Sequence, residues 1–292
     1  MLFRSVKNTY FEWQKDVLAA ASTTNAQLEG DDVAGYADLR NPTNRVANYT
    51  QISRKVISTT GTLEAVDKAG MRSYLAYELA KAASELKRDM ESTLTSNNAA
   101  IAGNDSTARQ TAGLGSWLVT NYVSNSSTNS VMSGNASSMP NDGYPSTART
   151  LGTQVSFTEA MLKSCIRQVW TQGGDPKVLM VGPFNKTQAS TFTGIAQIRY
   201  NVGDVEPAAI IGAADVYMSD FGTVSVVPSR FMRTRDALVL DPEYAAVAYL
   251  RPFATNELAK AGDAEKTQIL AELTLEMRNE AAHGIAADLA TS

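Results

Sequence analysis

The residue types that catalyse reactions are sparse in this sequence of 292 residues. It contains one histidine, His283, so any serine or cysteine nucleophile would have to use that residue as its general base. His283 directly precedes Gly284 near the end of the sequence, a poor position for a base that must be held rigidly. We therefore predict that His283 is a surface or partly packed side chain without a catalytic role.

The single cysteine predicts no reactive thiol either. Cys165 falls on the apolar stripe of a predicted helix, next to Ile166 and Val169, and no neighbour in the sequence would favour its thiolate form. We expect this side chain to be buried and unreactive. One cysteine also excludes an internal disulfide and any multi-cysteine metal site, which is typical of a protein made in a reducing cytoplasm.

Carboxylates and glycines give no recognisable site. Four carboxylates have a spacing that matches neither a calcium loop nor a glycoside hydrolase: Asp215, Asp220, Asp236 and Asp241. Gly113 and Gly115 lack the third glycine of a dinucleotide-binding loop, and the phosphate-binding pattern GxxxxGK[ST] does not occur. The sequence thus predicts no catalytic residue, cofactor or metal. A cytosolic hydrolase using Asp and Glu is left as an alternative without a supporting constellation.

Charge is nearly balanced overall but unevenly placed. With 26 basic and 30 acidic residues the net charge is −4, which argues against a dedicated nucleic-acid-binding protein. Residues 40–55 hold four basic side chains and no acid, whereas residues 257–280 hold six acids and three bases. These complementary patches suggest contacts between subunits, although two ordinary solvated faces would give the same pattern.

The sequence predicts neither a membrane span nor a secretion signal. No apolar run approaches the ~18 residues that a spanning helix needs, and the first residues are too polar and aromatic for a signal peptide. We expect a cytosolic, soluble chain with no membrane partner. At this length it can bury one substantial core or two smaller ones without a disulfide or a metal.

The first quarter of the chain predicts extended segments. Residues 2–36 show no sustained hydrophobic period and have little to pack against in their own chain. Residues 45–57 are rich in β-branched and aromatic side chains, and residues 62–66 form a second extended run, so we predict a two-stranded ribbon. Because an isolated ribbon is marginally stable in water, it would gain its order by lying on another subunit.

A long helix is predicted from Asp67, as its cap, to about Ser96. Its apolar stripe recurs at three- and four-residue spacing and consists of Leu75, Leu79, Ala82, Leu86, Met90 and Leu94. The opposite face carries side chains of both charges, spaced to pair along the helix: Glu78, Lys81, Glu85 and Arg88. At ~1.5 Å per residue this helix would span on the order of 40 Å, which suits a structural spine.

The remainder predicts an α/β region followed by strands. Residues 121–143 are rich in Ser, Asn and Gly, as in a surface loop, and Ser156 with Glu159 predicts a capping box that opens a helix bearing Cys165 and Trp170. The elements expected next are a strand at 177–181, a helix ending at Gly194, a hairpin at 214–227, and strands at 238–240, 245–250 and 269–277. The last of these alternates apolar and polar side chains, which predicts one face in water.

Seven segments spread over nearly the whole chain resemble the major head proteins of tailed bacteriophages. They are NTYFEWQKD (8–16), NAQLEGDD (25–32), NYTQISRKV (48–56), ELKRDME (85–91), GGDPKVLMVGPFNK (173–186), GAADVYMSDFG (212–222) and DALVLDPEYAAVAYLRPF (236–253). The order of the predicted elements likewise resembles the Hong Kong 97-type capsid fold. Relatives usually carry a further stretch before the first segment, whereas this sequence begins almost at it.

The resemblance implies an α+β chain with four named parts. Residues 1–36 correspond to the N-arm, 37–66 to the E-loop, 67–112 with 231–292 to the P-domain, and 113–230 to the A-domain. The E-loop residues expected to contact a neighbouring subunit, with the basic ones on its acidic C-terminal strands, are Arg45, Tyr49, Arg54 and Lys55. The spine helix is expected to pack Leu75, Leu79, Leu86 and Met90 on a P-domain sheet built by Leu238, Leu240 and Leu273.

The function implied by the resemblance is structural and not enzymatic. Copies of the chain would self-assemble into hexamers and pentamers of an icosahedral head, which encloses double-stranded DNA through non-specific contacts. A portal and cement or scaffold proteins are the further partners, and assembly in the host bacterial cytoplasm would yield the virion capsid. An encapsulin-like nanocompartment shell is the alternative with the same fold. Covalent crosslinking of Lys55 to a neighbour's asparagine is predicted to be absent.

Overall fold

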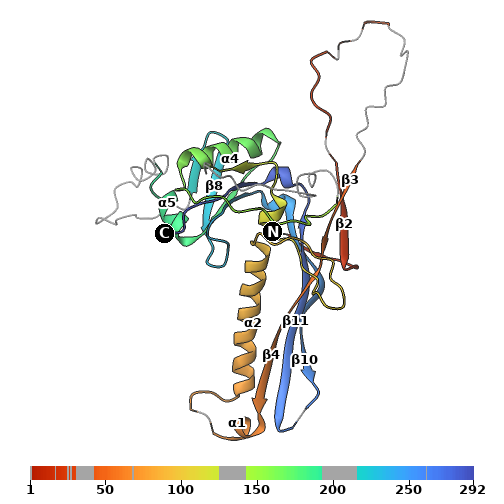
Figure 1. Ribbon diagram of the computed structural model, residues 1–292, viewed down its shortest axis with the longest axis vertical. Helices are drawn as coiled ribbons and strands as arrows, with labels where there is room; N and C mark the ends of the chain where they lie inside the picture. The colour runs from red at the N-terminus through yellow and green to blue at the C-terminus, as the bar shows by residue number, and fades with distance from the viewer. Residues whose placement is uncertain are drawn as a thin grey trace.

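Two β-sheets and a long helix form the body of the molecule. The computed structural model describes residues 2–16, 18–24, 26, 28–30, 43–67, 69–124, 143–192, 216–260 and 262–292. A four-stranded sheet carries the long helix α2 (Tyr74–Leu94) along one face, a six-stranded sheet carries helix α4 (Glu159–Thr171), and a two-stranded ribbon stands beside them (Figure 1). The fold is therefore α+β, as the sequence predicts.

The four-stranded sheet is built mainly from the C-terminal part of the chain. Its strand order is β1-β10-β11-β4, with bounds Leu2–Ser5, Ala245–Leu258, Ala264–Met277 and Gln51–Thr60. The strands β10, β11 and β4 are antiparallel, and β1 joins β10 in parallel. Strand β4 is thus an integral edge strand of this sheet, not half of a separate ribbon.

Helix α2 (Tyr74–Leu94) begins later than the predicted cap. Ser73 is the N-cap, and its hydroxyl accepts a hydrogen bond from the Ala76 amide. Gly70 has a φ of +82°, which no residue of a right-handed helix adopts, so a helix starting at Asp67 is broken there. The predicted extended run at 62–66 is also wrong, because Thr60 caps a short helix α1 (Gly61–Ala65).

The apolar stripe of α2 packs on the four-stranded sheet. Leu86 and Met90 are buried and share a cluster with Val247 of β10 and with Ile269 and Leu273 of β11. The residues partly buried against the same cluster are Leu75, Leu79, Ala83, Leu94 and Tyr249. Because apolar burial contributes about 25 cal/mol per Å², this contact stabilises α2 on the sheet.

The six-stranded sheet combines the middle of the chain with its end. Its strand order is β5-β12-β9-β6-β8-β7, with bounds Tyr122–Val123, Gly284–Ala286, Ala237–Leu240, Val178–Val181, Gly222–Pro228 and Val216–Ser219. The predicted hairpin is confirmed as β7 and β8. The placement of Leu238 and Leu240 in the same sheet as Leu273 is wrong: β9 is buried on both faces, and its pairing with β6 and β12 supplies that burial.

Helices cover one face of the six-stranded sheet. Helix α4 (Glu159–Thr171) is capped by Thr158, two residues beyond the predicted Ser156, and Trp170 is 55% exposed, off its buried face. Its buried residues are Met161, Leu162, Cys165, Ile166 and Val169. The remaining helical elements are α3 (Leu114–Trp117), α5 (Pro183–Ala189), η3 (Pro242–Tyr244) and η4 (Glu280–Ala282). The helix predicted to end at Gly194 is α5, which ends earlier, at Ala189, with Ser190 as its C-cap, so that predicted end is wrong. Most of the predicted loop at 121–143 lies outside the described residues.

The N-terminal residues pack on their own chain, contrary to the expectation from sequence. Strand β2 (Tyr10–Lys15) pairs antiparallel with β3 (Asn44–Tyr49), and this pair is the ribbon of the molecule. The Trp13 indole donates a 2.9 Å hydrogen bond to the Met277 carbonyl and lies 5.7 Å from the Trp117 ring. The aromatic side chains that looked scattered in the sequence therefore anchor the ribbon to the body.

Candidate assembly surface

The polar side of β11 is buried, although its alternating sequence predicted a face in water. Glu272, Thr274 and Glu276 alternate with apolar residues, yet each is at most 2% exposed. They are covered by segments that lie far away in the sequence. Two hydroxyl oxygens, those of Thr111 and Thr274, lie 3.3 Å apart in this layer.

Glu272 is held by three partners from three separate parts of the chain. The Arg109 guanidinium donates at 2.6 Å, the Arg251 Nε at 2.8 Å and the Thr50 hydroxyl at 2.7 Å. Burial alone would raise the pKa of Glu272, but the hydrogen bonds from Thr50 and Arg251 and the nearby arginine charges outweigh it and lower that pKa. The carboxylate therefore stays ionised and ties the 100–112 segment and β10 to β11.

Glu276 binds the N-terminal strand in the same way. Arg4 of β1 donates to its carboxylate at 2.6 Å, and Arg278 donates at 3.2 Å. Asn48 of β3 is fully buried and donates a 2.9 Å hydrogen bond to the Leu275 carbonyl. Nothing in the sequence pattern identified these partners, because each is brought to β11 by tertiary folding alone.

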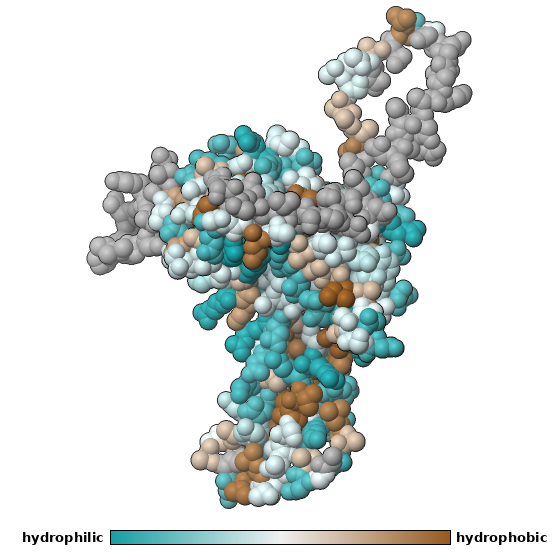
Figure 2. All heavy atoms as spheres, in the orientation of Figure 1, coloured by the Kyte–Doolittle hydropathy of each residue, from teal (hydrophilic) through white to brown (hydrophobic). Residues whose placement is uncertain are grey.

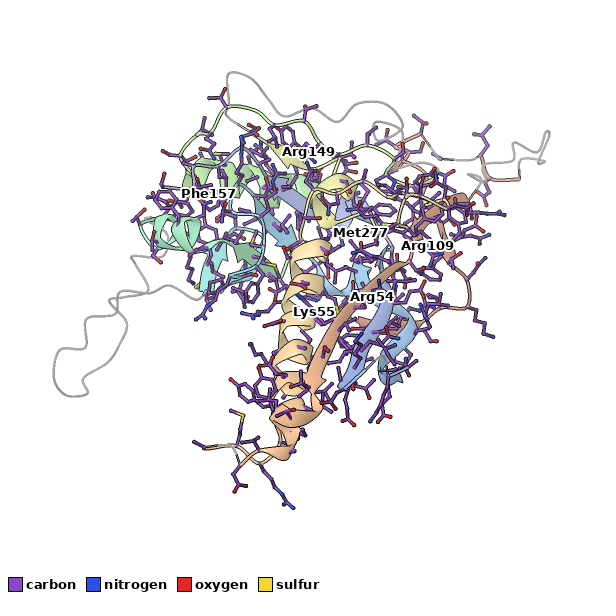
Figure 3. All side chains as sticks on the ribbon, turned by 60° about the horizontal axis from the view of Figure 1, so that its bottom comes forward. Arg54, Lys55, Arg109, Arg149, Phe157 and Met277 are labelled. Carbon is purple, nitrogen blue, oxygen red and sulfur yellow. The ribbon has the colours of Figure 1, made fainter. Side chains whose placement is uncertain are left out.

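The four predicted E-loop contact residues do not share one surface. Lys55 points toward α2 and pairs with Asp89 at 2.7 Å, whereas Arg54 lies on the other side of the same strand (Figure 3). Arg45 lies 3.6 Å from Glu12 across the ribbon. Tyr49 is half-buried, with its ring centroid 4.9 Å from that of Tyr10 and 5.1 Å from that of Tyr144.

The basic segment and the acidic C-terminal segment, which were predicted to meet between subunits, lie side by side within one chain. Strand β4 pairs with the C-terminal strand β11, so that Arg54 lies opposite Leu270 and Lys55 opposite Ile269. The basic strand and the acidic segment are thus neighbours in one subunit. A contact of these basic residues with a neighbouring copy stays a prediction.

A segment between β2 and β3 leaves the body without packing on it. We call its described residues, 18–24, 26 and 28–30, the arm. Leu18 is 94% exposed and Leu28 is 80% exposed. The arm extends from the ribbon at the end of the molecule opposite α1 (Figure 1). Folding of one chain thus leaves both of these leucine side chains in water.

The structure shows the surroundings of the two side chains that the sequence analysis considered for catalysis, Cys165 and His283. Cys165 is confirmed as fully buried, and burial raises the pKa of its thiol to about 12. His283 is not at the surface: it is 0% exposed, and its Nδ1 accepts a 3.1 Å hydrogen bond from the Asp241 amide. Burial lowers the pKa of His283 to about 4, so the ring is neutral and serves as a structural acceptor.

Two further features bear on function. Among the described residues, no three His, Cys, Asp or Glu side chains gather in a way that would hold a metal ion. No helix in the described ranges is both long and apolar enough to cross a membrane.

Comparisons with known proteins agree with this architecture. The family model of the SU10 major capsid protein matches residues 1–290. The major capsid protein of Escherichia phage Phieco32 is 26% identical over 309 aligned positions, which cover 96% of this chain and 86% of that protein.

Solved structures share the fold at low identity. The capsid asymmetric unit of cyanophage A-1(L) matches with a TM-score of 0.65 and 12% identity, covering 99% of this chain and 90% of that one. The holo-SrpI encapsulin complex of Synechococcus elongatus matches with a TM-score of 0.55 and 11% identity, covering 100% and 86%. The chain belongs to the SU10 major capsid protein family: it is a tailed-phage major capsid protein with the Hong Kong 97-type fold, a structural subunit of an icosahedral head.

Proposed function

We propose that the chain forms the head wall as hexamers and pentamers in which each copy lends its arm to a neighbour. The observation that carries this proposal is the arm itself, with Leu18 and Leu28 exposed at 94% and 80%. Two leucine side chains that stay in water do not stabilise a single chain. Burying each of them on a neighbour contributes about 1.5–3 kcal/mol to the stability of the contact. Assembly then supplies contacts that folding of one copy does not.

Weak contacts suffice for this purpose. In a closed shell every contact recurs by symmetry, so a modest interaction between two copies is multiplied over the particle. The buried carboxylates Glu272 and Glu276 support this role because they keep each subunit rigid while its arm is exchanged. The boundaries proposed for the N-arm, E-loop, P-domain and A-domain follow from the resemblance, with β4 attached to the P-domain sheet.

The role of this surface is to bind other chains, and we propose no reaction for it. Packaged double-stranded DNA would be contacted weakly and without sequence preference, since the net charge of −4 opposes strong binding to phosphates. A portal and cement or scaffold proteins are the further partners that a phage head needs. Assembly is proposed to take place in the bacterial cytoplasm.

An encapsulin-like compartment is the second candidate, favoured by the TM-score of 0.55 to the SrpI complex. At 11% identity that match shows a shared fold and does not indicate what the particle encloses. The cargo distinguishes the two candidates, because a phage head encloses nucleic acid and a compartment of this kind would enclose protein.

The experiment is to recover particles from lysed infected cells and to measure their sedimentation and their content. We expect large particles whose DNA resists added nuclease, and denaturing gels that show this chain at its single-chain size without covalent multimers. Particles filled with protein would favour the compartment. A chain that sediments alone would refute both, and a ladder of covalent multimers would refute the prediction about Lys55.

A further inference from the structure

A cavity of about 660 Å³ opens where the C-terminal end of α2 meets the loop between β8 and β9. On the face shown in Figure 2, hydrophilic side chains surround this end of α2. No Asp or Glu lines the cavity in the part of the chain that the structure describes. We call it the Arg149 cavity and define it by the polar and aromatic residues Ser92, Asn98, Arg149, Phe231, Arg233 and Thr234.

Arg149 is a buried cation with unused hydrogen-bond donors. It is 4% exposed, and its backbone amide and carbonyl bond to the Asn97 side chain at 3.0 and 2.7 Å, just beyond the end of α2 (Figure 3). The guanidinium carbon lies 4.6 Å from the centre of the Tyr122 ring, and Nη2 donates to the Leu118 carbonyl. Its Nε is buried without an acceptor. Such a side chain is unusual, because taking a charge out of water is costly unless an opposite charge is near.

The carboxylates around Arg149 are paired with other arginines. Asp236 and Asp288 act on Arg149 electrostatically, but Asp236 pairs with Arg233 at 3.3 Å and Asp288 pairs with Arg235 at 3.5 Å. Arg149 itself forms no ion pair among the described residues. Three arginines thus share two carboxylates, and the cluster holds one positive charge in excess. An anion in the cavity would balance it.

Further donors stand around the opening. The Arg88 guanidinium carbon lies 5.7 Å from the centre of the Phe231 ring, which lines the cavity, and the neighbouring Arg230 is exposed. In the described ranges neither Arg88 nor Arg230 belongs to an ion pair. Three lining residues also have side-chain polar groups without a hydrogen bond there: Ser92, Asn98 and Thr234.

We propose that the Arg149 cavity binds a phosphate group. Its donors come from three segments of the chain, namely the end of α2, Arg149 and the loop at 231–234. A phosphate has acceptor oxygens that point in different directions and can meet donors from all three, whereas the two oxygens of a carboxylate lie in one plane. Arginine also matches phosphate oxygens with paired N–H groups. The exposed Arg88 and Arg230 attract an anion toward the opening.

Two sources offer this group to the assembled particle. One is the backbone of packaged DNA, which rests on the proposed function and would be held without regard to sequence. The other is free inorganic phosphate, which needs no DNA. Both place the same chemistry in the cavity, so the experiment measures the site first and the source second.

The site is measured by equilibrium dialysis of radiolabelled inorganic phosphate against particles from which the DNA has been released. Wild-type particles should bind one phosphate per chain in a saturable manner. Ser92→Asp places a carboxylate in the cavity from the exposed side of α2 and should weaken binding at least tenfold.

The matched control makes the same substitution outside the cavity. Ser225 is an exposed residue of β8 that lies six residues before Phe231, about 20 Å along an extended chain. Ser225→Asp changes the net charge equally and should alter phosphate binding less than twofold. Equal loss in the two variants, or no saturable binding by wild-type particles, would overturn the inference.

Ultraviolet crosslinking of DNA-filled particles identifies the source. A nucleotide adduct on the peptide that contains Phe231, reduced in Ser92→Asp, would assign the phosphate to DNA. Trp170, which is 55% exposed on α4, is the internal control and should carry no adduct. Saturable phosphate binding without a Phe231 adduct would support the site with free phosphate as its ligand. If the wild-type chain never encloses DNA, the proposed function fails, and dialysis of the isolated chain still tests the cavity.

Discussion

His283 makes the stability of this fold depend on pH through a single side chain. Its Nδ1 accepts a hydrogen bond from the Asp241 amide, which a protonated ring cannot do. Burial lowers its pKa from 6.5 to about 4. The unfolded chain therefore binds the proton at higher pH than the folded chain, so this contribution is complete above about pH 6.5 and is lost as the pH falls toward 4.

We predict that His283→Asn removes the part of the pH dependence of the unfolding free energy that His283 causes. Between pH 6.5 and 4 the wild-type chain should lose on the order of 3 kcal/mol of unfolding free energy through His283, measured by urea denaturation. His283→Asn keeps an acceptor for the Asp241 amide and does not titrate, so its profile should be flatter by that amount. Asp236, whose pKa is raised by burial and which acts in the opposite sense, is common to both chains. Equal slopes in both chains would contradict the assignment.

Glu272 provides a second residue-scale prediction. Glu272→Gln leaves the Arg109 and Arg251 guanidinium groups without a carboxylate and should cost about 3 kcal/mol of unfolding free energy. Arg251→Gln is the matched control, because its side chain is 50% exposed and its removal leaves Arg109 in place, so it should cost less than about 1 kcal/mol. Denaturant midpoints compare the two, and equal losses would show that the carboxylate is not the centre of the cluster.

Local pattern predicted one of these side chains and missed the other two. Cys165 was predictable because Ile166 and Val169 place it on the apolar side of its own helix. His283 was not, since its partner Asp241 lies 42 residues away. Glu272 looked solvated because an alternating strand looks the same whether its polar face meets water or arginines from other segments.

At the scale of elements, substitutions in α2 test whether its apolar stripe faces the core. Leu86 is 1% exposed against the sheet, so Leu86→Ala should cost ~2 to 5 kcal/mol through lost burial and the cavity left behind. Leu79, which is only partly buried, should cost less. Lys81→Ala is the control and should stay within about 0.5 kcal/mol. If Leu86→Ala gave a fully stable subunit that assembles normally, the stripe would not face the core.

Helix α2 and strand β4 show which features of an element the sequence was sufficient to predict. The body of α2 was predictable from its three- and four-residue spacing, but its start was not, because Gly70 and Ser73 decide it together. Strand β4 was predicted as extended, yet its partner β11 lies about two hundred residues later in the chain, and strand pairing at that separation leaves no local signal. The same reason explains why β9 was assigned to the wrong sheet.

At the scale of the whole molecule, the resemblance of the sequence segments identified the class of protein. The place of each segment in the sheets came only from the tertiary structure. The resemblance spans nearly the whole chain and carries the Hong Kong 97-type fold, which the physical patterns alone suggested only in outline. It assigned residues 37–66 to an E-loop, and within that range the structure builds β4 into the four-stranded sheet.

Electron cryo-microscopy of particles purified from lysed infected cells tests the central claim most directly. We expect closed icosahedral shells with rings of five and six subunits, a wall in which α2 lies along the four-stranded sheet, and duplex DNA inside. A chain that never forms particles, or shells whose subunits do not fit this arrangement of α2 and the sheet, would contradict it.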